Sequence, residues 1–339
     1  MASTTENNRA GVEIAHGGRI EQARRQFPGA PEPFIDLSTG INSLSYPVPA
    51  LPASAYTRLP EPEALATLQA VAARAYGVRD PTMVVAAPGT QILIETLPRI
   101  WKIPRVAVLG PTYAEHAAAW RRGGAKVENV ESLASVANAH CVVLCNPNNP
   151  DGHRLEPATL VKLADRLAMQ DGLLVVDEAF ADFENSEDWL APFLPHPAIV
   201  ILRSFGKTYG LAGLRLGFAL AAADRAAEIR AALGPWAVSG PALAIGSEAL
   251  ANGGWLENAR SRLTMDVTRL DVILRNAGLS VLGGTRLFRL TETPAAAAVF
   301  NRLGQSGILV RRFDTHPHWL RFGLPGGAAE WDRLRDALR

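Results

Sequence analysis

Apolar residues between positions 62 and 221 form two kinds of run, which alternate along the chain. Four segments place apolar residues three and four positions apart, as in a helix with one buried face: EALATLQAVAARAYGV, QILIETLPRI, YAEHAAAWRRGG and PATLVKLADRLAMQDG. The other runs are short and continuously apolar: TMVVAAPG, RVAVLGP, AHCVVLCNP, LLVVDEAF, AIVILRSF and LRLGFALA. Continuous runs are typical of strands buried on both faces, so the alternation predicts an α/β fold with a mainly parallel sheet flanked by helices.

The pattern differs at both ends of the chain. Residues 1–55 are rich in Pro, Gly, Ser and Asn, which predicts an extended N-terminal arm with one short helix around Arg19–Gln26. Near Ala231 two helical segments begin, and they are followed by strand-like segments separated by one helix. We therefore predict three parts: the arm at 1–55, a large domain at 56–230 and a smaller α+β C-terminal domain at 231–339.

Composition narrows the classes of function. The chain has 339 residues, 48% of them hydrophobic and 20% charged, with a formal net charge of +1. This balance is typical of globular enzymes and gives no sign of a nucleic-acid or membrane partner. Because no segment approaches the roughly 18 apolar residues of a membrane span, we expect a cytoplasmic protein.

The two cysteines, Cys141 and Cys145, lie four positions apart in one predicted strand. Side chains at that spacing share a face of the strand but are too distant for a disulfide. We interpret both as small core residues.

Polar residues directly follow several of the predicted strands. In an open parallel sheet, ligands bind beyond the carboxyl ends of the strands, so these residues are expected at one edge. A glycine before a helix start also offers a phosphate site, although many helices begin this way. The residues concerned are Gly89 and Thr90, Asn149, Asp177, and Ser204 with Lys207.

This combination of groups fits one cofactor, pyridoxal 5'-phosphate. A lysine can bind its aldehyde as a Schiff base, and a carboxylate can keep its pyridine nitrogen protonated. An amide can donate to its ring hydroxyl, while hydroxyl and guanidinium groups can bind its phosphate.

Three motifs in register, NPNNPDG, VVDEAF and SFGKTYGLAGLRLG, resemble those of the fold-type I aminotransferase superfamily. The resemblance implies that Lys207 is the Schiff-base lysine and Asp177 the partner of the pyridinium. It also implies that Asn149 donates to the ring hydroxyl and that Arg321 binds the substrate carboxylate. The other implied cofactor contacts are Gly89, Thr90, Ser204 and Arg215 at the phosphate, with Tyr113 stacking on the ring.

A lysine in that role needs a lowered pKa, which explains why Lys207 follows a strand and is surrounded by small and apolar residues. Two positions depart from the superfamily pattern. Asp151 replaces the usual threonine of the turn, and since aspartate also favours turns, the geometry is expected to persist. Phe180 stands where many relatives carry a tyrosine, which leaves Asn149 as the side-chain donor to the ring oxygen.

The segment AHGGRIEQARRQFPGAPEPFIDLSTGINSLSYP resembles the opening of the threonine-phosphate decarboxylases of cobalamin biosynthesis, and the resemblance continues through GPWAVSGPALA and GILVRRF. It implies decarboxylation of L-threonine O-3-phosphate to (R)-1-aminopropan-2-yl phosphate and CO2. The alternative is an aminotransferase acting on a phosphorylated substrate such as histidinol phosphate, because those enzymes share the core motifs. The joint presence of Lys207, Asp177 and Arg215 argues against a non-catalytic binding protein.

A phosphorylated substrate needs donors beyond those that hold the cofactor. Our candidates are His16, Asn42 and Arg311. Each has a simpler interpretation: a turn residue on the arm, a turn cap, and a surface pair with Asp314, respectively. We expect no metal, because the His316–His318 pair has no evident further ligands nearby.

Relatives of this kind carry a tyrosine that reaches the cofactor phosphate of the partner subunit. That tyrosine directly precedes a proline, whereas Tyr56 lies upstream of the Leu59–Pro60 pair. Whether Tyr56 has this role is left open. The resemblance implies a homodimer with a shared active site.

Overall fold

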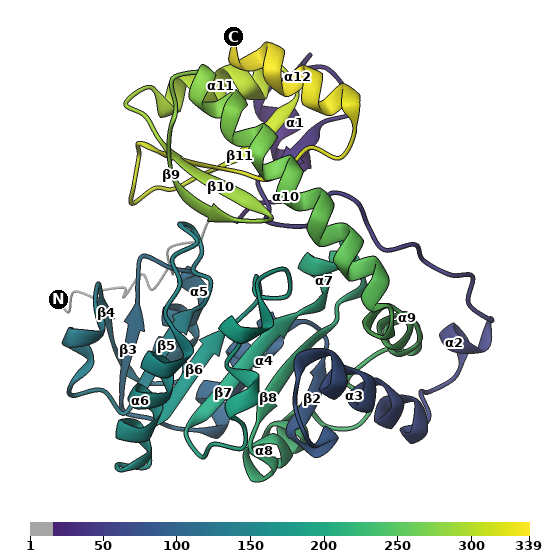
Figure 1. Ribbon diagram of the computed structural model, residues 1–339, viewed down its shortest axis with the longest axis vertical. Helices are drawn as coiled ribbons and strands as arrows, with labels where there is room; N and C mark the ends of the chain where they lie inside the picture. Colours follow the sequence, from purple (N-terminus) through teal and green to yellow (C-terminus); the bar gives the residue numbers. More distant parts are fainter. Residues whose placement is uncertain (1–15) are drawn as a thin grey trace, which may run out of the picture.

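The computed structural model describes residues 16–339, which form two sheets with their helices (Figure 1). The first fifteen residues of the predicted arm lie outside the described residues. The larger sheet has seven strands in the order β2-β8-β7-β6-β5-β3-β4. Their bounds are β2 Val84–Ala87, β3 Arg105–Leu109, β4 Lys126–Val130, β5 Cys141–Cys145, β6 Leu173–Asp177, β7 Ile199–Ser204 and β8 Gly217–Ala221.

Strand directions confirm the predicted mainly parallel sheet. Neighbouring strands from β7 to β4 pair in parallel, and only β8 is antiparallel to its two neighbours, β7 and β2. The edge strand β4 was not predicted, because four of its five residues are exposed or half-buried and give no apolar run.

Helices cover both faces of this sheet. One apolar core lies between the sheet and α3, α6 and α9, and a second lies between its other face and α4, α5 and α8. Six helices thus bury the strands on both sides, as their continuous apolar runs predicted. The bounds are α3 Pro62–Tyr76, α4 Thr90–Ile100, α5 Ala114–Arg122, α6 Pro157–Ala168, α8 Ala223–Leu233 and α9 Gly240–Ala251.

The smaller sheet has five strands in the order β1-β11-β12-β10-β9 and forms the predicted α+β unit. Its core contains apolar residues of the long helix α10 and of α11 and α12. In Figure 1, α10 runs from beside α9 up to this second unit. The bounds are α10 Gly253–Asn276, β9 Ser280–Thr285, β10 Phe288–Glu292, α11 Ala296–Gln305, β11 Ile308–Arg312, β12 Trp319–Phe322 and α12 Ala328–Leu338.

The arm takes part in both units. Its predicted short helix is confirmed as α1, Ile20–Gln26, and the strand β1, Ile35–Leu37, pairs in parallel with β11. Helix α9 begins after residue 231 but packs beside α3 of the large unit. The division of the chain at residues 55 and 230 stays a prediction.

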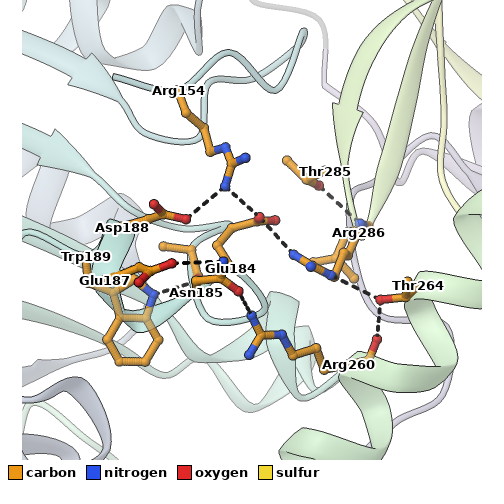
Figure 2. Close-up of polar contacts among 12 residues, drawn as sticks. Arg154, Glu184, Asn185, Glu187, Asp188, Trp189, Arg260, Thr264, Thr285 and Arg286 are labelled. Carbon is orange, nitrogen blue, oxygen red and sulfur yellow. Dashed lines mark hydrogen bonds and ion pairs between the residues drawn. The ribbon is translucent and has the colours of Figure 1, made fainter. Parts of the chain in front are cut away.

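A polar network joins the two units (Figure 2). The carboxylate of Glu184 accepts from Arg154 at 3.1 Å and from Arg286, which follows β9, at 2.8 Å. Nearby, Arg260 of α10 donates to the side-chain oxygen of Asn185. Two charged groups from different units thus share one carboxylate.

None of the helices between residues 16 and 339 combines the length and apolar character needed to cross a membrane.

Candidate active site

A cavity of about 330 Å³ lies at the carboxyl ends of the parallel strands, where the sequence predicted the site. The arm, the large sheet and β12 of the small sheet all contribute to its wall. Among the predicted residues that line it are His16, Gly89, Thr90, Tyr113, Asn149, Asp177, Ser204, Lys207, Arg215 and Arg321. Asn42 and Arg311 are outside this lining set.

Lys207 lies on the one-turn helix α7, Phe205–Thr208, which directly follows β7. Its Nζ is 5.4 Å from the ring centre of Phe180. Burial lowers the pKa of the Lys207 amine, and the positive charges of Arg321 and Arg215 act in the same direction, whereas Asp177 opposes them. The amine is therefore more readily deprotonated than a surface lysine, which a nucleophile requires.

Asp177 is the last residue of β6, and each of its two carboxylate oxygens contacts a protein group. Its Oδ1 accepts from the backbone N–H of Ala179 at 3.0 Å, and its Oδ2 lies 2.9 Å from Nε2 of His116. Burial by itself would lower the pKa of His116, but hydrogen bonds to Asp177 and Cys145 outweigh it and raise the pKa to about 10. The raised pKa favours the cationic form of His116 at neutral pH, in which the ring donates to Asp177.

Sequence reasoning missed His116 and the role of Cys145. His116 lies in the first turn of α5, three positions after Tyr113, which directly precedes that helix. This closeness in sequence to a predicted site residue was the available signal. Cys145 is buried as predicted, but it also lines the cavity.

Within residues 16–339, one group has metal-ligating atoms close together, all within 4.8 Å: His116, Cys145 and Asp177. His116 makes hydrogen bonds to both other members. Since His116 is already bonded to Asp177 at 2.9 Å, we assign no metal to them.

Arg321 comes from β12 and reaches across to the large unit. Its guanidinium donates to Oδ1 of Asn149 at 2.5 Å and to the carbonyl of Ser38 at 2.8 Å. Its Nε is buried and has no hydrogen-bond partner among residues 16–339. A buried cationic donor that faces a cavity is a site for a carboxylate. With its oxygen on Arg321, Asn149 keeps its NH2 group as the donor.

The start of α4 and the residue Arg215 form the anion-binding end of the cavity. Gly89 precedes α4 with φ of +86°, and a Cβ there would lie 2.5 Å from a guanidinium nitrogen of Arg215. The guanidinium thus packs against the glycine at a helix N-terminus, where backbone N–H groups are unpaired. Ser204 closes β7 at the same edge.

The two departures from the superfamily pattern have different outcomes. Oδ1 of Asp151 accepts from the side chain of Asn148 and the backbone N–H of His153, both at 2.9 Å, so the turn is retained. Phe180 packs edge-on against Phe288 with ring centres 5.0 Å apart. It adds an apolar wall where a tyrosine would add a hydroxyl.

His16 lies at the cavity wall, with its Nε2 2.9 Å from Oε1 of Glu115. Tyr113 donates its hydroxyl hydrogen to Oε1 of Gln91 at 3.1 Å, and burial raises its pKa. The phenol therefore stays neutral and its ring forms a wall of the cavity. Through the contact between His16 and Glu115, the arm is joined to α5, which begins directly after Tyr113.

Asn42 is placed differently from the prediction. It is buried, its Nδ2 donates to the carbonyl of Thr208 at 3.0 Å, and its Oδ1 accepts from Arg262 at 2.6 Å. Since both ends of the amide already bind protein groups, the side chain is not directed at a ligand.

Arg311 lies on β11, in register with Arg321 on β12. Burial lowers the pKa of Arg311, and the neighbouring Arg19 acts in the same direction. The charge of Arg311 in turn helps lower the pKa of Arg321. The positive charges of Arg19, Arg311 and Arg321 therefore lie near one another, and Arg19 was not among the predicted residues.

Comparisons with known proteins agree with this architecture. The model of the family "Aminotransferase class I and II" matches residues 35–338. The chain is 43% identical to a threonine-phosphate decarboxylase of a Sinorhizobium species and 40% identical to one of Pseudomonas aeruginosa, in each case over 96% of this chain and 97% of the relative.

Among solved structures, a histidinol-phosphate aminotransferase of Sinorhizobium meliloti in complex with pyridoxal 5'-phosphate superposes with a TM-score of 0.81. The two chains are 21% identical, and the match covers 99% of this chain and 97% of the other. This likeness confirms the predicted fold-type I fold. The chain belongs to the aminotransferase class I and II family, in which threonine-phosphate decarboxylases are its relatives over nearly the full length.

Proposed function

We propose that this protein is a pyridoxal 5'-phosphate-dependent decarboxylase of L-threonine O-3-phosphate. The single observation that carries the proposal is the cavity that combines Lys207, Asp177 and Arg215 with the unpaired Nε of Arg321. The names of the two relatives at 40% identity or more support the choice of substrate.

The side chains in the cavity fit the cofactor. Thr90, Ser204 and Arg215, with the N–H groups at the start of α4, would hold its phosphate. Asp177, which is hydrogen-bonded to His116, would hold a proton on its pyridine nitrogen, and the NH2 group of Asn149 would donate to its ring oxygen. When bound, the cofactor supplies an electron sink for the electron pair left at Cα when a bond there breaks.

The substrate would be held at both ends. The guanidinium of Arg321 would bind the carboxylate. We assign the phosphate to His16, which lines the cavity, and to Arg311, which neighbours Arg321, with Arg19 next to Arg311. With the substrate carboxylate fixed by Arg321 and Asn149, the Cα–carboxylate bond is the one presented for cleavage. CO2 leaves, its bonding electrons stay at Cα, and a proton supplied there completes the product (R)-1-aminopropan-2-yl phosphate.

The amine of Lys207, with its lowered pKa, is the group in this cavity suited to carry protons to and from Cα. The same amine would serve an aminotransferase, in which the Cα–H bond breaks instead. The orientation of the bound substrate decides between the two reactions.

The deciding experiment mixes the purified protein and cofactor with threonine phosphate, and measures CO2 against keto-acid formation. We expect CO2, and we expect Lys207→Ala to abolish it together with the borohydride-reducible cofactor adduct. Faster transamination of histidinol phosphate than CO2 release from threonine phosphate would reject the decarboxylase.

We also propose that the protein is a homodimer. Large apolar side chains are exposed on and beside α2, Ser54–Thr57: Val48 is 57%, Tyr56 68% and Leu59 64% exposed. A second copy would cover this surface and bring Tyr56 to the partner's cofactor phosphate. A cytoplasmic location stays a prediction from the sequence.

Sedimentation of the parent and of Leu59→Glu tests the dimer. We expect a dimer that the variant shifts to monomer, and a parent that sediments as a monomer at micromolar concentration would contradict the proposal. Tyr56→Phe in an intact dimer then tests the contact with the cofactor, with weaker cofactor binding expected.

A further inference from the structure

Asn42 is the point where the arm, the lysine segment and α10 meet. Its backbone N–H donates to the carbonyl of Lys207 at 2.9 Å, and its side-chain NH2 group donates to the carbonyl of Thr208 at 3.0 Å. Its side-chain oxygen accepts from Arg262 at 2.6 Å. One residue thus uses its main chain and its amide to join three parts of the protein.

The arm continues along the lysine segment beyond Asn42. The backbone N–H of Tyr46 donates to the carbonyl of Tyr209 at 2.8 Å, and the hydroxyl of Ser45 donates to the carbonyl of Gly210 at 2.9 Å. Gly210 has φ of +64°, and a Cβ there would lie 2.7 Å from the carbonyl oxygen of Asn42. The two backbones therefore touch, with the arm bonded to four consecutive carbonyls.

Helix α7 cannot fix Lys207 without outside support. It has a single turn, and a single turn is not stable on its own. Its last carbonyls have no following helical N–H groups as donors, so they need partners from elsewhere. Asn42 supplies donors for two of them, while the Thr208 hydroxyl is held separately by Asp182 at 2.6 Å.

Arg262 binds the other end of the Asn42 amide, its side-chain oxygen. It lies on α10 and is itself held by Asp266 at 2.8 Å, one turn further along the helix. Because the arginine is charged, its hydrogen bond to the amide oxygen of Asn42 is stronger than one between neutral groups. Only a side chain with both an acceptor and a donor can bind Arg262 and Thr208 at once, which asparagine does and alanine or aspartate does not.

We propose that Asn42 is a positioning residue, which fixes the main chain of Lys207 and ties it to α10. The proposal rests on the proposed function only in that Lys207 is the reacting amine. It replaces the prediction that Asn42 binds the substrate phosphate. Displacing a reacting group by about 1 Å costs on the order of 100-fold in rate, so loss of this contact acts on turnover rather than on substrate binding.

The test compares Asn42→Ala and Asn42→Asp with a matched control, Asn252→Ala. Asn252 is the residue that directly precedes α10. Its side-chain oxygen caps that helix by accepting from the backbone N–H of Trp255 at 3.0 Å. Its loss removes this cap and a hydrogen bond of 3.4 Å to the hydroxyl of Tyr46, but no hydrogen bond to residues 207–210. Asn42→Asp keeps the acceptor for Arg262 and removes the donor to Thr208, so it stays informative if the alanine variant does not fold.

The first readout is hydrogen exchange in the protein without cofactor. We expect amides in residues 205–212 to exchange about 10-fold or more faster in both Asn42 variants, and to be unchanged in Asn252→Ala. Equal exchange in all three variants would overturn the proposal. This readout does not depend on which reaction the protein catalyses, so it separates a failure here from a failure of the proposed function.

The second readout is turnover. We expect Asn42→Ala to lower kcat by about 10- to 100-fold for threonine phosphate and for threonine alike, with KM nearly unchanged. A loss confined to threonine phosphate, with a raised KM, would restore Asn42 as a phosphate ligand and overturn the positioning role.

Discussion

Arg215 has a left-handed backbone conformation, which residues with a Cβ seldom adopt. It has φ of +54°, and within residues 16–339 only two other non-glycine residues, Asp171 and Trp236, have a positive φ. The left-handed conformation costs a residue with a Cβ roughly 1–2 kcal/mol. The arginine adopts it and thereby brings its guanidinium against Gly89, where the cofactor phosphate is proposed to bind.

The contact between Gly89 and Arg215 gives a prediction. We expect Gly89→Ala to displace the guanidinium and weaken cofactor binding by about 10- to 100-fold, the loss of one charge-assisted contact to an anion. The control is Gly124→Ala. Gly124 has a similar φ of +91°, but among residues 16–339 nothing beyond its chain neighbours lies within 4 Å of the new Cβ. Cofactor titration by absorbance measures both, and equal losses would show that backbone strain alone is responsible.

His116 gives a prediction about pH. Its pKa is raised from 6.5 to about 10 in the folded protein, so its bond to Asp177 stabilises the fold fully below about pH 6.5. That contribution is lost as the pH rises through about 10. We expect the free energy of unfolding of His116→Phe, measured without cofactor, to depend less on pH than that of the parent between about pH 7 and 10.

Two features make that comparison selective. Lys207 and Arg321, whose pKa values are lowered by burial, are present in both proteins, so the difference isolates His116. His196→Gln serves as the control, since His196 pairs with the exposed Asp165. Parallel pH profiles for parent and His116→Phe would mean that His116 is not charged in the fold.

His16 should separate phosphorylated from unphosphorylated substrate. Charge-assisted hydrogen bonds to phosphate contribute roughly 1.5–3 kcal/mol, so His16→Ala should lower kcat/KM for threonine phosphate by about 10- to 150-fold. Slow turnover of threonine should hardly change. CO2 release measures both substrates, and equal losses would show that His16 only joins the arm to Glu115.

At the scale of elements, buried strands and long helices were predictable because apolar periodicity reports burial directly. The direction of β8 was not, since a continuous apolar run reads the same in either direction. The strand β1 was missed for another reason. It has three residues in a Pro- and Gly-rich arm, and its partner β11 lies far along the chain.

In the site, too, residues in local motifs were predictable, whereas contacts between distant parts of the chain were not. Lys207, Asp177 and Arg215 stand in local motifs next to strand ends, so the sequence was sufficient to locate them. Asn42 was assigned to the phosphate because a sequence does not show that both ends of its amide are already bonded to Thr208 and Arg262.

The Glu184 network between the two units gives a prediction at this scale. Glu184→Gln removes the charge shared by Arg154 and Arg286, and Glu184 is only 8% exposed. We expect a loss of about 1–3 kcal/mol in stability, seen as a lower Tm. The control is Asp332→Asn, which breaks an exposed pair with Arg335 and should cost less than about 1 kcal/mol. Similar losses in both would mean that the network adds nothing beyond a surface pair.

At the scale of the whole molecule, the cavity is assembled from parts that lie far apart in the sequence. The arm provides His16 and residues 38–41, the large sheet provides Lys207 and Asp177, and β12 provides Arg321. The backbones of the two units also touch, because a Cβ on Gly152 would lie 2.1 Å from the carbonyl oxygen of Gly284. The geometry of the site therefore depends on how the two units are docked.

The parallel pairing of β1 with β11 has a consequence for biosynthesis. Among the described residues, β1 is the first strand to leave the ribosome, and it must wait for β11, near the end of the chain, before it has a partner. The large sheet, whose strands lie between residues 84 and 221, can form meanwhile. The part of the arm around β1 and the wall that β12 supplies with Arg321 are therefore the last parts of the cavity to be put in place. A nascent chain stopped before β11 holds Lys207 in a site that is still open.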